Sequence, residues 1–184
     1  KYNHLDISKY KVSDTLTKKI QEARLKGKLL LFHPYSASIH KSMPQSITID
    51  LLKEFLFKLE DYMVISTLQI DPKIKEDNFV DLSKESKNLN DFIYIISQMD
   101  EIFTTDTSTY HISDIFMIQT IVVFTQADYE RKIKYYKYVK PIYIKDESKN
   151  LSKFIYENES LTFYKFESWK KIKISQIIKL LDKF

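Results

Sequence analysis

The chain has 184 residues, of which 43% are hydrophobic and 29% charged, a composition typical of one globular domain with a full core rather than of a disordered protein. It contains no cysteine, which excludes disulfides and thiolate metal sites, and no apolar run approaching the ~20 residues of a transmembrane helix. The net charge of +4 comes from lysines scattered among acidic residues, with arginine only at Arg24 and Arg131, and therefore argues against nucleic acid as a partner.

The first predicted helix begins after Ser13, a candidate N-cap, and ends near Gly27. Between these positions apolar side chains recur at helical spacing at Leu16, Ile20 and Ala23. Gly27 is the only glycine of the chain. Because the residue that follows a helix often adopts the left-handed conformation, which glycine reaches without strain, we expect a positive φ at Gly27.

Strands and helices alternate over the rest of the chain. Apolar and β-branched runs predict strands at residues 28–32, 62–66, 79–82, 101–104, 120–124 and, as an edge strand because of Pro141, 139–144. Helical spacing of apolar residues predicts helices near residues 52–59, 88–96, 111–117 and 174–181. The lysine- and tyrosine-rich segment between residues 125 and 138 shows no period and is predicted to be irregular.

Such alternation is typical of βαβ units, whose right-handed crossovers place helices against a parallel sheet. The sequence therefore predicts an α/β fold, a three-layer Rossmann-like domain with a mainly parallel sheet. We expect residues 1–184 to form this single domain, with the last helix, about residues 168–184, packing back on it. Because the first residues resemble neither an initiator methionine nor a signal peptide, the chain is interpreted as a C-terminal fragment of a longer protein.

Two polar segments follow predicted strands, at the sheet edge where parallel α/β domains bind ligands. In the first, residues 33–44, Lys41 is a flexible point charge able to neutralise a phosphate, and Ser36 and Ser38 supply hydroxyl donors. The alternative is an ordinary polar loop that contains one of many lysines.

The second polar segment, residues 104–111, leaves a strand and enters a helix. The N–H groups of the first helical turn, together with the helix dipole, favour an anion such as a pyrophosphate. Five serine or threonine side chains among these eight residues add hydrogen-bond donors, and Asp106 is suited to accept from sugar hydroxyls or to brace the turn. The alternative is a helix N-cap, which most helices have.

Taken together, the two segments resemble the heptosyltransferase family (glycosyltransferase family 9). In that family the C-terminal Rossmann domain of a two-domain GT-B fold reads like HPG(A/S)S followed by KRWP, and then DTGPxH before an apolar strand. Here the first motif has the family's spacing at His33, Pro34, Ser36, Lys41 and Pro44. The second motif matches at Asp106, Thr107 and His111, and residues 120–124 supply the strand.

The resemblance implies a nucleotide-sugar donor site, typically for ADP-heptose, in one half of a GT-B glycosyltransferase that makes a surface polysaccharide or lipooligosaccharide. Lys41 with Ser36 and Ser38 would contact the phosphates. Asp106, Thr107 and the backbone at Ser108 would hold the diphosphate and sugar, with His111 nearby.

The catalytic residues implied by the resemblance lie outside this chain. The family has its proposed general base in an N-terminal domain, through which a glycan or glycolipid acceptor would also bind. We therefore assign no catalytic residue here and expect the isolated chain to be inactive. No metal ion or cofactor is expected, since the nucleotide-sugar is the substrate.

The motif departs from the family at its glycines, which correspond to Tyr35, Ser108, Met117 and Thr125. Glycine permits a positive φ and close approach of the backbone to a ligand. Three interpretations remain open: a pocket relaxed for another donor, a reshaped active site, and a non-catalytic interaction module that retains the half-fold. An AT-rich genome would also deplete glycine without loss of function. A nucleotide-sugar epimerase with a similar two-domain fold is a further alternative.

The expected location is the cytoplasm, since the sequence has no cysteine and no signal-peptide pattern. Residues 131–140, the densest basic stretch, are interpreted as a loop with solubilising charge; the alternative is a peripheral contact with the inner face of a membrane or with an anionic acceptor. His33 is interpreted as a packed residue rather than a general base. Trp169 is expected in the core or on a surface that a partner domain covers.

Overall fold

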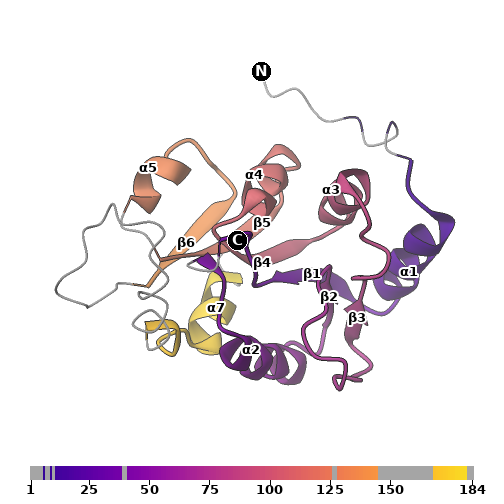
Figure 1. The fold of residues 1–184 in the computed structure, drawn as a ribbon, viewed down its shortest axis with the longest axis horizontal. Helices are drawn as coiled ribbons and strands as arrows, with labels where there is room; N and C mark the ends of the chain where they lie inside the picture. Colours follow the sequence, from indigo (N-terminus) through magenta and orange to yellow (C-terminus); the bar gives the residue numbers. More distant parts are fainter. Residues whose placement is uncertain are drawn as a thin grey trace.

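A computed structural model of the chain describes residues 6, 9, 11–38, 41–125, 128–144 and 168–181 (Figure 1). The strands are β1 (Lys28–His33), β2 (Tyr62–Ser66), β3 (Phe79–Asp81), β4 (Glu101–Thr105), β5 (Gln119–Phe124) and β6 (Val139–Tyr143). The helices are α1 (Asp14–Arg24), α2 (Gln45–Lys58), α3 (Leu89–Ser97), α4 (Ser108–Ile115), α5 (Tyr129–Ile133) and α7 (Ile174–Leu181).

The six strands form one sheet in the order β3-β2-β1-β4-β5-β6, and every neighbouring pair is parallel. The chain moves outward from β1 to β3 and then returns to β4, on the other side of β1. This is the strand order of dinucleotide-binding Rossmann domains, which bind ligands where the order reverses, outside the carboxyl ends of the strands. The predicted Rossmann-like α/β fold is confirmed, and β6 lies at the edge, as Pro141 requires.

Helices cover both faces of the sheet (Figure 1). Alternate residues of β1 serve the two faces, because successive side chains of a strand point in opposite directions. Leu30 and Phe32 pack into the core beneath α2 and α7, with the Phe32 ring 5.2 Å from that of Phe55 on α2. Leu29 and Leu31 pack instead into the core formed with α1 and α3. Each such fully buried side chain contributes about 1.5–3 kcal/mol to folding.

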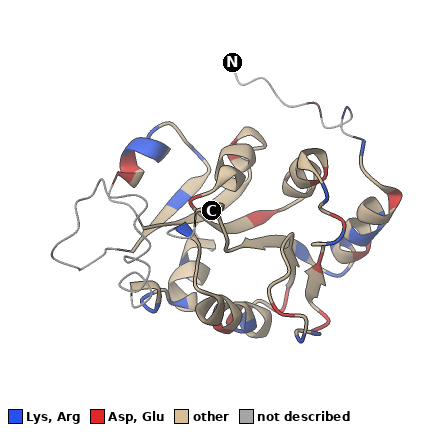
Figure 2. Ribbon diagram, in the orientation of Figure 1, with Lys and Arg blue, Asp and Glu red and all other residues tan. Residues whose placement is uncertain are grey.

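The C-terminal helix α7 packs in the same core as α2 through Ile174, Ile177 and Leu181. Trp169, which precedes it, is buried in that core, so it is a core residue rather than an exposed partner surface. In the described ranges, no helix combines the length and apolar content needed to cross a membrane. Basic and acidic residues occur together on α1, α2 and α5 (Figure 2).

Two predicted local features differ from the structure. Helix α4 begins at Ser108, three residues before the predicted start, because Thr107 rather than a later residue is its N-cap. The segment after β5, predicted to be irregular, contains the short helix α5. Its residues carry no apolar period because none of them is buried, so the pattern on which the prediction depends is absent.

The predicted positive φ at Gly27 is wrong, since no glycine among the described residues has one. Helix α1 ends instead at Arg24, and its C-cap residue Leu25 has the right-handed helical conformation. Gly27 is required by space: a Cβ at this position would lie 2.6 Å from the backbone oxygen of Asp61, which accepts a hydrogen bond from the N–H of Lys28. The glycine therefore lets the start of β1 approach the turn before β2.

A Gly27→Ala substitution is expected to lower the free energy of unfolding by about 1–3 kcal/mol, because the backbone of Asp61 must move to admit the methyl group. Urea unfolding measures the effect, with Lys26→Ala at the exposed neighbouring position as the control. Equal stability of the two variants would show that the close approach imposes no constraint.

Candidate functional site

The candidate site lies where the strand order reverses, at the carboxyl ends of β1 and β4. A hydrogen bond joins these two ends: Oγ1 of Thr104 donates to the backbone oxygen of His33 over 3.0 Å. After β4 the chain passes through Asp106 and enters α4, whose N-cap Thr107 accepts from the N–H of Thr109 over 3.2 Å. The alternative that this segment forms a helix N-cap is thus correct for Thr107. The carboxylate of Asp106 takes no part in this cap.

Asp106 is the centre of an ion-pair cluster with two lysines. Its Oδ2 lies 3.1 Å from Nζ of Lys41, in the loop after β1, and 2.8 Å from Nζ of Lys132, on α5. Lys132 also lies 3.6 Å from Oδ1 of Asp128, one turn earlier. The Asp106 side chain is 7% exposed, whereas those of Lys41 and Lys132 are 28% and 24% exposed. The structure therefore brings together Lys41 and Asp106, as the sequence predicted, and adds Lys132.

The electrostatics of the cluster keep Asp106 ionised. Burial by itself would raise the pKa of Asp106, but the hydrogen bonds and positive charges of Lys132 and Lys41 outweigh it and hold the pKa below its ordinary value. With Asp128, which contacts Lys132, the cluster contains two lysines and two aspartates, so its formal charges balance. Among the described residues, no three His, Asp or Glu side chains gather into a metal site.

The loop that carries Lys41 is held by its own serines. Oγ of Ser42 accepts from the N–H of Ser36 over 2.8 Å and donates toward the backbone oxygens of Ser36 and Ser38, at 3.0 and 3.1 Å. Oγ of Ser36 in turn accepts from the N–H of Ser38 over 3.3 Å. The predicted phosphate contacts of Ser36 and Ser38 remain predictions, since these bonds show the two residues building the loop. Met43, in place of the family tryptophan, is buried in the core.

His111 lies on the exposed side of α4, where its Nδ1 hydrogen-bonds the hydroxyl of Tyr136. Partial burial lowers the pKa of His111; the charge of Asp106 opposes this shift, and the charges of Lys41 and Lys132 reinforce it. The pKa of His111 therefore depends on the charges of the ion-pair cluster. Ser108, the first residue of α4, is exposed beside it.

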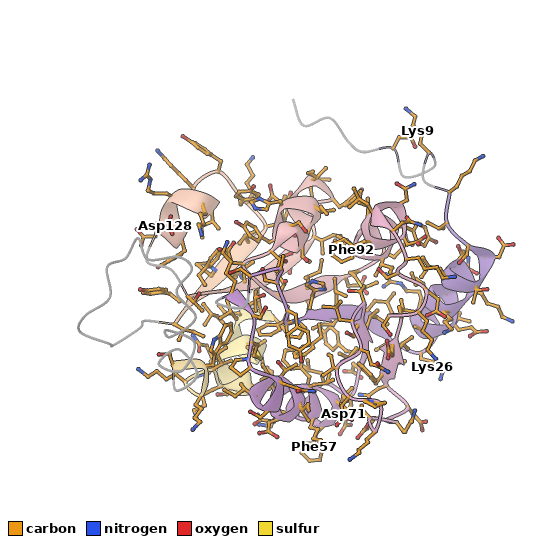
Figure 3. The ribbon with its side chains drawn as sticks, in the orientation of Figure 1. Lys9, Lys26, Phe57, Asp71, Phe92 and Asp128 are labelled. Atoms are coloured by element: carbon orange, nitrogen blue, oxygen red, sulfur yellow. The ribbon has the colours of Figure 1, made fainter. Side chains whose placement is uncertain are left out.

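Lys132 is the site residue that sequence reasoning missed. Residues 131–140 are interpreted from the sequence as a loop with solubilising charge that leads into the edge strand predicted at 139–144; β6 is where it was predicted, but Arg131–Ile133 belong to the helix α5. The available signal was local: Asp128 and Lys132 are four residues apart, the spacing of an ion pair on one helix face. Figure 3 shows Asp128 beside the start of α5.

One of the four positions that correspond to family glycines has a left-handed backbone. Among the described residues only Met117 has a positive φ, 58°, at the turn between α4 and β5. The positions of Tyr35, Ser108 and Thr125 therefore need no glycine for conformational reasons.

His33 is a packed residue, as predicted. Its Nδ1 lies 3.0 Å from Oγ1 of Thr67, and its ring lies 5.4 Å from the ring of Phe92 on α3. Burial lowers the pKa of His33 from 6.5 to about 4. The ring is therefore neutral at physiological pH, which suits a structural hydrogen bond.

Known proteins resemble this chain in structure rather than in sequence. No protein-family model matches it, and no curated protein sequence is significantly similar. A glycosyl transferase of family 9 from Veillonella parvula DSM 2008 superposes with a TM-score of 0.60 at 14% identity, over 94% of this chain and 52% of that one. An ADP-heptose LPS heptosyltransferase II from E. coli superposes with a TM-score of 0.55 at 12% identity, over 88% of this chain and 53% of that one.

The chain has the fold of one half of these glycosyltransferases. It spans about half the length of each of them. The resemblance first noted on Lys41 and on Asp106 to His111 thus extends to the fold, which at such low identity is what the likeness establishes.

A Met117→Gly substitution is expected to raise the free energy of unfolding by about 0.5–1 kcal/mol, because relief of the left-handed conformation outweighs the added freedom of the unfolded chain. The Met117 side chain is 50% exposed, so little packing is lost. Met117→Ala is the matched control, since it shortens the side chain but keeps the strained Cβ. A gain shared by both variants would assign the effect to the side chain instead.

The depressed pKa of His33 predicts a loss of stability on acidification. As the pH falls from 6.5 toward 4, the unfolded chain binds a proton that the folded chain excludes, so the free energy of unfolding falls by about 3 kcal/mol. Urea unfolding at pH 7 and pH 4.5 measures this loss in the wild type and in His33→Gln, which cannot titrate. We expect the wild type to lose about 2–3 kcal/mol more than the variant; identical losses would assign the acid sensitivity to other groups.

Proposed function

We propose that this chain is the nucleotide-sugar donor-binding domain of a glycosyltransferase. The observation that carries the proposal is the convergence of Lys41 and Asp106 at the switch point of the parallel sheet, beside the N-terminus of α4. A positively charged side chain and a helix N-terminus at this edge are suited to a diphosphate. The likeness in fold to two glycosyltransferase structures supports the same class.

The roles we assign follow from the position of each group. Lys41 neutralises the diphosphate, and the backbone of Thr107 and Ser108 at the start of α4 faces the same anion. Asp106 accepts hydrogen bonds from the sugar hydroxyls, which an ionised carboxylate does well. Ser36 and Ser38 shape the loop that presents Lys41, and His111 borders the site.

One of the structural neighbours is named as an ADP-heptose heptosyltransferase, so ADP-heptose is the first donor that we propose for this chain. In this proposal the acceptor is a glycan or glycolipid of a bacterial surface polysaccharide or lipooligosaccharide. The acceptor and the catalytic base belong to an N-terminal domain outside this chain, and the reaction takes place in the cytoplasm, at the inner face of the membrane. The nucleotide-sugar is the substrate, and no separate cofactor takes part.

A second candidate function is that of a non-catalytic interaction module. The specific observation in its favour is that Asp106 already has two lysine partners from its own chain. A buried carboxylate paired in this way also serves as a structural link between loops. In that case the ion pairs hold the fold together and no anion replaces them.

Calorimetric titration with ADP-, GDP-, UDP- and CDP-sugars separates the two candidates. We expect one nucleotide class to bind with a Kd on the order of 1 mM, because this chain spans about half the length of the glycosyltransferases that it resembles. Lys41→Met should weaken this binding at least ~10-fold, since the variant loses a charge-assisted contact to phosphate. Lys53→Met, on the exposed face of α2, removes the same charge elsewhere and is the control.

Absence of any heat at millimolar concentrations of all four donor classes would favour the interaction module. Unchanged affinity of Lys41→Met would move the binding site away from the ion-pair cluster.

A further inference from the structure

The two lysines of the cluster come from opposite sides of the site and meet on one atom. Lys41 follows β1 and Lys132 lies on α5, beyond β5, yet both ammonium groups contact Oδ2 of Asp106. At 3.1 and 2.8 Å from the same oxygen, the two nitrogens lie within about 6 Å of each other. Asp128 lies against Lys132 one turn earlier on α5 and so limits where its ammonium group can go.

Two ammonium groups held this close repel each other; Asp106 contacts both of them, and Asp128 contacts Lys132 alone. Two adjacent phosphoryl groups are the anion that matches this arrangement, because they present oxygens to both lysines at once and carry enough charge to neutralise both. A monophosphate has one phosphoryl group and satisfies the pair less completely. Both lysine side chains are about one quarter exposed, so part of each is accessible from solvent.

We propose that Lys41 and Lys132 form a clamp for two adjacent phosphoryl groups, and that Asp106 occupies the clamp as an internal counter-ion until a diphosphate replaces it. The proposal rests on the proposed function for the identity of the ligand, the diphosphate of a nucleotide-sugar. Lys132 thereby becomes a specificity-determining residue for diphosphates over monophosphates.

Replacement of Asp106 by the diphosphate at the two lysines gives this carboxylate a second role, in binding the sugar. While both lysines hold its Oδ2, the carboxylate is engaged within the protein and 7% exposed. Once the diphosphate takes over the lysines, the carboxylate is released to accept hydrogen bonds from the sugar that the diphosphate carries. The sugar therefore adds affinity only when it is attached to a diphosphate, which couples recognition of the two parts of the donor.

The first experiment compares ADP, AMP and inorganic pyrophosphate as ligands by calorimetry. Lys132→Met should weaken the binding of ADP and pyrophosphate at least ~10-fold and that of AMP less than ~3-fold. Lys134→Met, one residue past α5, makes the same change at an exposed position and should leave all three affinities unchanged. Lys132→Arg keeps the charge and should stay within ~3-fold of the wild type, so it replaces the methionine variant if that one fails to fold.

The second experiment uses Asp106→Asn, which removes the counter-ion. Pyrophosphate should bind at least ~3-fold more tightly, while the advantage of an ADP-sugar over ADP disappears. Weaker pyrophosphate binding by this variant would overturn the counter-ion role. Unchanged ADP affinity in Lys132→Met, or an equal loss for ADP and AMP, would overturn the clamp.

The outcomes also separate this inference from the proposed function. If pyrophosphate binds in a Lys132-dependent manner but no nucleotide-sugar binds, the clamp stands and the donor assignment fails. If nucleotide-sugars bind and Lys132→Met has no effect, the donor assignment stands and the clamp fails. If pyrophosphate does not bind the wild type at all, the clamp is overturned.

Discussion

Right-handed connection between parallel strands is the constraint on which the site depends. The chain moves from β1 to β3 in one direction and from β4 to β6 in the other, so the helices that follow β1 and β4 must lie on opposite faces of the sheet. Helix α2 packs on one core and α4 on the other side (Figure 1). The two loops that leave β1 and β4 therefore diverge at the place where parallel α/β sheets bind ligands. The ion pair of Lys41 with Asp106 joins these two loops.

The cost of burying a carboxylate explains why Asp106 is paired with lysines at this place. An ionised Asp106 with 7% of its side chain exposed needs compensating charge, and removal of one partner from such a group costs more than the pair contributes. Two lysines meet this need from two separate segments, which ties the β1–α2 loop and α5 to the start of α4. An anion that entered the site would find the lysines already placed. The stability of the ligand-free domain and the affinity for a ligand thus depend on the same three side chains.

The fold could be predicted from the sequence because its signals are local. Strand runs such as 28–32 and the helical stripe of Leu52 to Leu59 follow directly from burial on one or both faces. Proximity of Lys41 and Asp106 could also be predicted, because carboxyl ends of parallel strands share one edge. The contact of Lys132 with Asp106 could not be predicted, since the spacing from Asp128 indicates only an ion pair on one helix face and relates α5 to no other element. The close approach of Gly27 to Asp61 involves residues distant in sequence, which a local pattern does not contain. The positive φ of Met117 belongs instead to the local turn that ends α4, where the N–H groups of Met117 and Ile118 donate to the backbone oxygens of Asp114 and Ser113.

The central claim is that the cluster of Lys41, Asp106 and Lys132 is where a ligand binds. Chemical-shift mapping of the amide groups during a titration with ADP tests this claim most directly, because it locates the ligand without a substitution. The largest shifts are expected at Asp106 to Thr109, in the loop around Lys41 and at Lys132. Shifts confined to other surfaces, such as α1 or α7, or no shift at millimolar ADP, would contradict it.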